Sequence, residues 1–191
     1  MTNRILNFLI LILITSVSYA QSKGTSNSGI KAGYNISSVR NNDQSETNHK
    51  NGFHVGLYNE YFISNNVAFQ TELVYSQQGY EVQNNSYKLT QELDYINLAT
   101  TFKMYPVKFF FVELGPQLGY AISHTERTES FINSTREFTP NSFTWGLNAG
   151  VGLVSKGGFT LSGRYYYGLG EIVNDTEYFN NVLQLSVAFK F

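Results

Sequence analysis

The chain has 191 residues, a length that suits one domain, and its formal net charge is −1. Charged residues make up only 14% of it, whereas roughly one quarter is usual in soluble domains, and aromatic residues reach 16%. This balance argues against a nucleic-acid-binding protein, which needs a basic field, and the absence of cysteine excludes disulfides and a lipid anchor on cysteine.

Residues 1–20 predict a secretory signal peptide. Arg4 supplies a short basic region, the apolar run ILNFLILILI follows it, and Ser18 and Ala20 occupy the small-residue positions before a cleavage site. The apolar run is short for a membrane-spanning helix of about 20 residues, so we predict cleavage after Ala20 rather than a retained anchor. Residues 21–29 then read as a polar linker, and residues 30–191 as a single barrel domain.

From residue 30 onward, apolar and polar residues alternate with a period of two, which indicates β-strands with two unlike faces. The stretch FTWGLNAGVGLV at 143–154 is the clearest, because its odd-numbered residues are apolar and its even-numbered residues up to 152 are small or polar. The predicted strands are 30–37, 52–63, 67–78, 93–104, 110–123, 143–154, 159–169 and 182–191. Their lengths suit tilted strands that cross a bilayer.

The connections between these strands alternate in length. Long polar segments lie at 38–51, 79–92, 124–141 and 170–181, and short ones at 64–66, 105–108 and 155–158. Short periplasmic turns and long outer loops are typical of up-and-down barrels in outer membranes. We therefore predict an all-β fold, an eight-stranded antiparallel up-and-down transmembrane β-barrel with both ends of the chain on the periplasmic side.

The distribution of side-chain sizes predicts which face is the outside. The small residues on the polar face of 143–154 suit a narrow lumen, so the apolar face is expected to meet outer membrane lipid. Large aromatics on that face gather near the strand ends, as in the aromatic girdles of membrane barrels. One girdle is predicted from Tyr61, Phe69, Phe102, Phe159 and Phe189, and the other from Phe53, Tyr75, Tyr120, Phe143, Trp145, Tyr165 and Tyr167. A soluble lipocalin-like carrier is the alternative.

The opposite strand parity fills the lumen. The charged residues predicted inside are Arg164, Glu72, Glu113, Lys103, Glu60, Lys31 and Lys190, and their uncharged companions are His54, Tyr58, Asn97, Gln117, Asn148, Tyr166 and Gln184. Charges in a tight interior need partners. We expect a network across the lumen between Arg164, Glu72 and Glu113, with Lys31, Glu60, Lys103 and Lys190 clustered near the periplasmic end. An eight-stranded barrel is just wide enough to be filled by side chains, which favours a plugged lumen over a narrow or gated pore.

The histidines give little support to catalysis. His49 and His124 fall in outer loops and His54 in the lumen. A set of Ser123, His124 and Glu126 could be considered for a hydrolase, but neighbouring residues at a strand end point in different directions. We predict no enzyme and no catalytic residues, and keep a lipid-modifying barrel as an alternative.

The outer loops offer no metal site and one candidate contact. Asp43, Glu46 and His49 are too loosely spaced for metal ligands, so no metal or cofactor is expected. Phe131 and Ile132 lie in the middle of the longest loop. They are expected either to contact a partner or to pack onto the barrel rim.

Three segments carry a family resemblance: KMYP at 103–106, ELGPQLGY at 113–120 and GRYYYGLGEI at 163–172. In this order, with the export segment and the terminal Phe191, the chain resembles the PorT-like outer-membrane β-barrel proteins of Bacteroidetes and, more distantly, the small OmpX/OmpA-type barrels. The resemblance covers the whole mature chain and implies an eight-stranded outer-membrane barrel. It implies little about activity, although the namesake takes part in type IX protein secretion. Phe191 ends an alternating aromatic strand, which is typical of outer-membrane barrels handed to the assembly machinery, so it is predicted to be an assembly signal.

The sequence thus predicts a monomeric, non-enzymatic outer-membrane barrel with a structural or interaction role through its extracellular loops. The expected partners are outer membrane lipid, the barrel assembly machinery during insertion, and an unknown ligand of the loops, with no nucleic acid. The alternatives are a small pore, an accessory of protein secretion and a lipid-modifying enzyme.

Overall fold

The computed structural model describes residues 24–40, 48–84, 87–129, 134–136, 142–171 and 178–191, with the side chains of 81–89 and 124–136 left out of the description. The predicted signal peptide, residues 1–20, lies outside this part of the chain. No helix within it is long and apolar enough to span a membrane.

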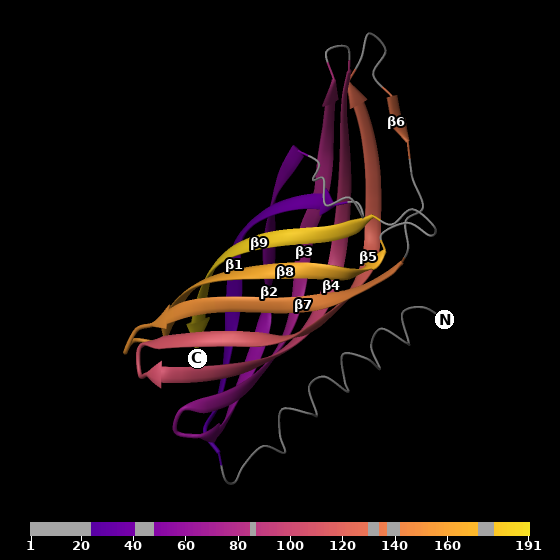
Figure 1. Ribbon diagram of the computed structural model, residues 1–191. Helices are drawn as coiled ribbons and strands as arrows, with labels where there is room; N and C mark the ends of the chain where they lie inside the picture. The colour runs from indigo at the N-terminus through magenta and orange to yellow at the C-terminus, as the bar shows by residue number, and fades with distance from the viewer. Residues whose placement is uncertain (1–23, 41–47, 85–86, 130–133, 137–141, 172–177) are drawn as a thin grey trace, which may run out of the picture.

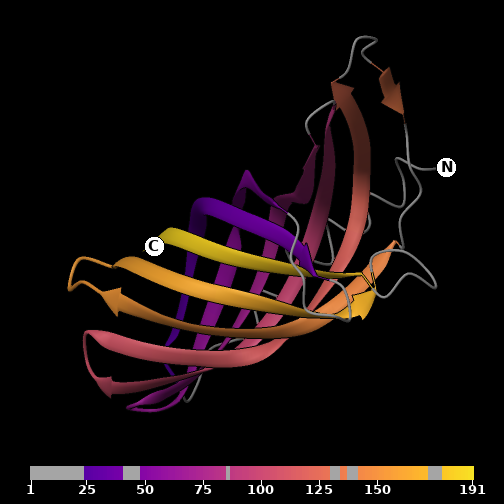
Figure 2. The same ribbon diagram turned by 45° about the horizontal axis from the view of Figure 1, so that its top comes forward.

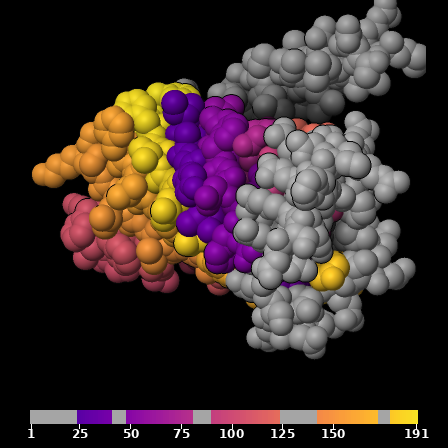
Figure 3. Space-filling view, turned by 90° about the horizontal axis from the view of Figure 1, so that it is seen from above, coloured from indigo at the N-terminus to yellow at the C-terminus, as the bar shows by residue number. Residues whose placement is uncertain are grey.

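The described residues form one antiparallel sheet that closes into a barrel (Figure 1). The strands are β1 (Ser26–Arg40), β2 (Asn48–Ser64), β3 (Val67–Asn84), β4 (Tyr87–Val107), β5 (Phe110–Glu129), β6 (Ser134–Arg136), β7 (Phe143–Val154), β8 (Phe159–Glu171) and β9 (Phe179–Lys190). Each long strand pairs with its sequence neighbour among the long strands, and β1 pairs with β9. Figure 3 shows β9, β1 and β2 side by side on the outer surface. Without the short β6, which pairs only with β5, the barrel has the predicted eight strands.

The period-two pattern decides which residues fill the barrel. Along β7, exposed and buried residues alternate almost without interruption. Trp145 and Leu147 are 49% and 46% exposed, whereas Thr144 and Asn148 on either side of them are buried. The apolar face is therefore the outer one, as predicted, and the interior is mainly polar.

Several strands are longer than predicted. β1 begins at Ser26 rather than at residue 30, and Ser26 pairs with Tyr61, so the last part of the predicted linker belongs to the sheet. β4 and β5 continue as a long hairpin beyond the ends of β7, β8 and β9 (Figures 1 and 2), and β6 lies within the longest predicted loop. These extensions are polar and held by backbone pairing, so no apolar alternation marks them in the sequence.

The short turns and the end of β9 lie together at one end of the barrel, called here the short-turn end (Figure 1). Gly158, in the turn between β7 and β8, has a φ of 87°, a conformation that glycine adopts readily. Its carbonyl accepts a hydrogen bond of 3.1 Å from the Lys190 amide, which fixes the end of β9 beside this turn.

Candidate functional site

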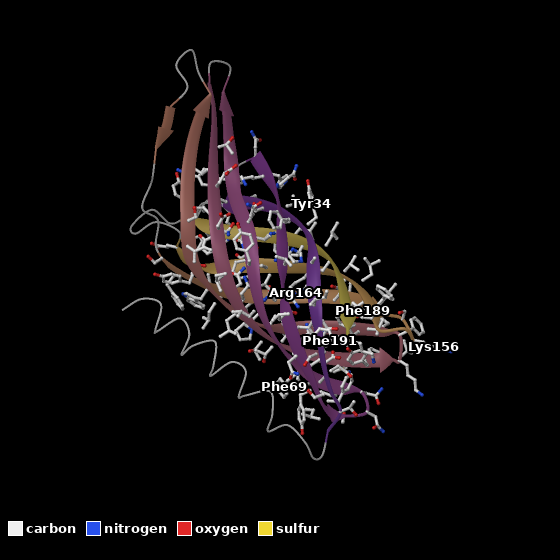
Figure 4. All side chains as sticks on the ribbon, turned by 180° about the vertical axis from the view of Figure 1, so that it is seen from behind. Tyr34, Phe69, Lys156, Arg164, Phe189 and Phe191 are labelled. Atoms are coloured by element: carbon white, nitrogen blue, oxygen red, sulfur yellow. The ribbon has the colours of Figure 1, made fainter. Side chains whose placement is uncertain are left out.

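Arg164 on β8 lies in the centre of the lumen and is only 2% exposed. Its Nε donates to Glu113 Oε1 at 2.7 Å. Its two terminal nitrogens donate to the two oxygens of Glu72 at 2.8 and 2.5 Å. The guanidinium thus binds one carboxylate in a bidentate way and a second through Nε, an arrangement with strong directional preference. Figure 4 shows Arg164 inside the barrel, far from Lys156 at the short turn.

A glycine makes room for this contact. Arg164 pairs across the sheet with Gly150 on β7, and Gly150 pairs with Glu113 on β5. A Cβ atom at Gly150 would lie 2.9 Å from Glu113 Oε1. The missing side chain therefore lets Arg164 reach past β7 to the carboxylate on the next strand.

Lys31 on β1 joins the same cluster. Its Nζ lies 3.1 Å from Glu72 Oε2, and Gln70 Nε2 donates to Glu72 Oε1. Lys31 also lines the cavity at the short-turn end together with Glu60, Lys103 and Lys190, the residues with which it was predicted to cluster. Its contact with Glu72 was not predicted, and it arises because the long lysine side chain extends across the lumen from β1 to the carboxylate on β3.

A second ion pair lies nearer the short-turn end. Lys103 Nζ is 3.4 Å from Glu60 Oε1 and 4.0 Å from Glu113 Oε2, and it donates to Gln70 Oε1 at 2.5 Å. Tyr105 Oη donates to Glu60 Oε1 at 2.5 Å. The second pair is thus linked to the first through Gln70 and Glu113.

Lys190 is the one predicted lumen charge that this network leaves out. It is exposed at the mouth of the barrel, and its side chain packs on Gly158, where a Cβ would lie 2.7 Å from Lys190 Cγ. The six charges that are buried and connected, Arg164, Lys31, Lys103, Glu72, Glu113 and Glu60, balance in sign. Such balance is what burial of charge in a narrow lumen requires.

A polar layer follows on the long-loop side of the charges. The ring of His54 is 1% exposed, with Nδ1 2.8 Å from Asn35 Oδ1 and Nε2 2.9 Å from Ser186 Oγ. These contacts join β2, β1 and β9. Beyond this layer, Val39, Leu93 and Tyr95 form a buried apolar cluster. The other predicted lumen residues are all buried: Tyr58, Asn97, Gln117, Asn148, Tyr166 and Gln184.

The lumen is packed at its centre and open at the short-turn end. The space among Lys31, His54, Glu72 and Arg164 leaves no room for a water molecule. Below it, a cavity of about 710 Å³ extends to the short turns, and we call this cavity the vestibule. The aromatic residues Phe62, Tyr105 and Phe111, which line it, were not among the predicted lumen residues. Tyr105 lies two residues after Lys103, and Phe111 lies two residues before Glu113. The alternation of faces along each strand would therefore have predicted that both point into the lumen.

The aromatic residues predicted for the girdles lie on the outer face. All are exposed except Tyr75, which is half-buried. At the short-turn end, Phe69 pairs with Phe102 and Phe159 with Phe189, with ring centroids 5.5 and 4.9 Å apart. Towards the long loops, the Phe53 and Tyr75 rings are 5.7 Å apart. The remaining members are Tyr61, Tyr120, Phe143, Trp145, Tyr165 and Tyr167.

Phe191 is 78% exposed, and its amide donates to the Ser28 carbonyl at 3.0 Å. Its proposed role as an assembly signal stays a prediction. The described residues contain no group of three or more histidine, cysteine or acidic side chains that could hold a metal. The side chains of His124 and Glu126 lie outside the described part of the chain, and so do Asp43, Glu46, Phe131 and Ile132.

Comparison with solved structures supports the barrel assignment, while no curated protein matches the chain. Ail, the attachment invasion locus protein of Yersinia pestis, solved in complex with the heparin analogue sucrose octasulfate, superposes with a TM-score of 0.55 at 16% identity, covering 89% of this chain and 100% of Ail. Neisserial surface protein A superposes with a TM-score of 0.54 at 16% identity, covering 87% of this chain and 99% of that protein. At such identities the likeness concerns the fold alone.

The family comparison covers most of the chain. The match spans residues 19–174, from the predicted cleavage region to the loop that follows β8. Together with the closed barrel, its apolar outer face and its polar lumen, it shows that the chain belongs to the family described as outer membrane protein β-barrel domain and that its place is the bacterial outer membrane.

Proposed function

We propose that this protein is a non-enzymatic outer-membrane barrel with a side-chain-filled lumen, which acts as a structural or interaction protein through its extracellular loops. The observation that carries the proposal is the Arg164 cluster. Arg164 and Lys31 pair with the carboxylates of Glu72 and Glu113 across the lumen, and the space among Lys31, Glu72 and Arg164 does not admit water. An interior arranged in this way supports a plug better than a path for solutes.

The surroundings of His54 also support a non-enzymatic role. Both ring nitrogens are occupied by Asn35 and Ser186, and the side chain is 1% exposed. A general base needs access to the group from which it takes a proton. His54 is instead held as a link between strands.

Single-channel recording tests the plug. The protein, purified from outer membranes and shown to be heat-modifiable on a gel, is expected to give no steady openings in a planar bilayer. The control is a pore-forming barrel prepared in the same way, which verifies that insertion is detected. Steady openings that change when Arg164→Gln is introduced would contradict the proposal and favour the pore alternative.

A deletion strain tests the non-enzymatic part. The mass of lipid A is expected to be the same with and without the protein. A mass change that His54→Ala or His124→Ala abolishes would instead favour the lipid-modifying alternative.

We further propose that the chain falls in the PorT-like subgroup. The segments that carry this resemblance also supply the lumen: KMYP contains Lys103 and Tyr105, ELGPQLGY contains Glu113, and GRYYYGLGEI contains Arg164. The same deletion strain distinguishes a secretion accessory from a structural barrel. Loss of protein export, with co-purification of envelope partners, would favour the accessory role, whereas normal export would favour the structural one.

A further inference from the structure

We propose that the vestibule is a binding site for an amphiphilic anion, a molecule with an apolar body and a phosphate or carboxylate group. It lies at the short-turn end, which faces the periplasm in barrels of this kind. The inference goes beyond the role of the outer loops, because it concerns the opposite end of the barrel. The inference rests on three features of the vestibule: the lysine charges at its mouth, the apolar side chains along one wall, and the Arg164 cluster that closes its inner end.

The charge at the mouth is unbalanced. Lys108, Lys156 and Lys190 line the vestibule and are exposed. In the described part of the chain, no side-chain carboxylate pairs with any of them. The carboxylates of Glu60 and Glu113, which also line the cavity, already pair with Lys103 and Arg164. The mouth therefore offers three ammonium groups to an anion.

One wall of the vestibule is apolar. Tyr105 and Phe111 pack with Ala68 in a buried cluster, and Phe62 and Val154 pack against it. The Phe111 ring lies over Gly152, where a Cβ would come within 2.3 Å of Phe Cζ, and Lys103 Nζ stands 4.0 Å from the ring centroid. These rings offer an apolar surface in the same cavity as the lysines, unlike the wall formed by Thr160 and Ser162.

The floor of the vestibule is closed by the Arg164 cluster, so the cavity is a blind pocket rather than a passage. Its volume of about 710 Å³ falls within the range of small-molecule sites. Because Arg164 is fully engaged with carboxylates, the cations left for a ligand are the lysines, which bind phosphate and carboxylate as point charges.

Two sources share this ligand chemistry. One is the headgroup of an anionic phospholipid in the inner leaflet around the mouth, and the other is a free amphiphile in the periplasm. Both present a negative group to the lysines and a hydrocarbon portion to the aromatic wall. Lys156 lies at the tip of its short turn, at the outer edge of the mouth (Figure 4).

Backbone amide NMR on the isotope-labelled protein, purified as for the conductance measurement, tests the proposal. In a non-ionic detergent, octyl phosphate is expected to cause saturable shifts at Gly158, Thr160 and Ala188, with much weaker binding of inorganic phosphate. In nanodiscs, the same signals are compared between phosphatidylglycerol and phosphatidylcholine. Binding of octyl phosphate identifies a free amphiphile as a sufficient ligand, whereas shifts seen only with phosphatidylglycerol identify the lipid headgroup.

Two variants and one control separate the contribution of the lysine charges to binding from that of the apolar wall. The triple variant Lys108→Gln, Lys156→Gln, Lys190→Gln is expected to bind about tenfold more weakly, since it removes the unpaired ammonium groups. Val154→Thr keeps the shape and should weaken octyl phosphate binding while leaving that of inorganic phosphate unchanged. Lys50→Gln, near the long-loop end of β2, should leave the binding of both probes at the vestibule unchanged.

The proposal is overturned if no probe shifts the vestibule signals in a saturable way. It is equally overturned if the triple variant binds like the unmodified chain, or if inorganic phosphate binds as tightly as octyl phosphate. The last result would show that the apolar wall contributes nothing.

Discussion

At the scale of single residues, Arg164 is the group whose loss should cost most. It is the cation shared by Glu72 and Glu113, which are themselves almost fully buried. Arg164→Gln should lower the free energy of unfolding by about 3–5 kcal/mol, because it leaves buried carboxylates without their main partner. Urea unfolding in detergent micelles measures the change, and exposed Lys156→Gln, expected within about 0.5 kcal/mol of the unmodified chain, is the control.

The double variant Arg164→Gln, Glu113→Gln distinguishes charge from packing. It removes the cation together with one of the carboxylates that would otherwise be left unpaired. The loss in the free energy of unfolding should therefore be smaller than the sum of the losses in the two single variants. Strict additivity would indicate that Arg164 acts through its volume rather than through its charge.

The lumen residues differ in how far their positions follow from the sequence. Parity alone assigned Arg164, Glu72 and Glu113 to the lumen, since period two fixes the face of each side chain. It did not predict that Lys31 contacts Glu72. That contact depends on the stagger between β1, β2 and β3, where Lys31 is level with Gly56 and Gly56 with Val74, and on the reach of a long side chain.

At the scale of elements, the seam between β1 and β9 depends on Gly33. A Cβ there would lie 2.0 Å from the Leu185 carbonyl oxygen and 2.7 Å from His54 Cε1. Because a backbone atom cannot move away cheaply, Gly33→Ala should destabilise the barrel by about 1–3 kcal/mol. Urea unfolding of the purified protein measures this loss, and heat-modifiability reports whether the barrel still closes.

Gly163→Ala on β8 is the matched substitution. Its Cβ would meet only Leu185 Cδ2 at 3.8 Å, so stability should stay within about 0.5 kcal/mol. Equal effects of the two alanines would mean that the strand propensity of glycine, rather than crowding at the seam, determines the result.

The strand bounds were predicted correctly where the bilayer requires one face of a strand to be apolar. The bounds of β7 match the prediction at both ends, because one face of this strand is apolar along its whole length. β4 extends to Tyr87 and β5 to Glu129, well beyond the predicted ends. A hairpin outside the apolar band can be polar on both faces, so its sequence resembles that of a loop.

At the scale of the whole molecule, the barrel has an apolar outer face towards lipid and a polar interior. A soluble protein has the opposite arrangement, with a polar surface around an apolar core. Leu73 on β3 lies between two aromatic levels of that face, with Phe69 towards the short turns and Tyr75 towards the long loops. It is 42% exposed and pairs with Leu57 and Leu98, which are also exposed. This row of leucines marks the middle of the apolar band.

A charge in that row should therefore be costly only in a bilayer. Leu73→Arg is expected to lower the free energy of unfolding in phospholipid vesicles by about 2–4 kcal/mol, whereas Val107→Arg at the end of β4 should cost about 0–1 kcal/mol because it lies near the interface. In detergent micelles, which let water approach the substituted side chain, the difference should shrink. Equal costs at both positions in vesicles would contradict this placement of the bilayer along the strands.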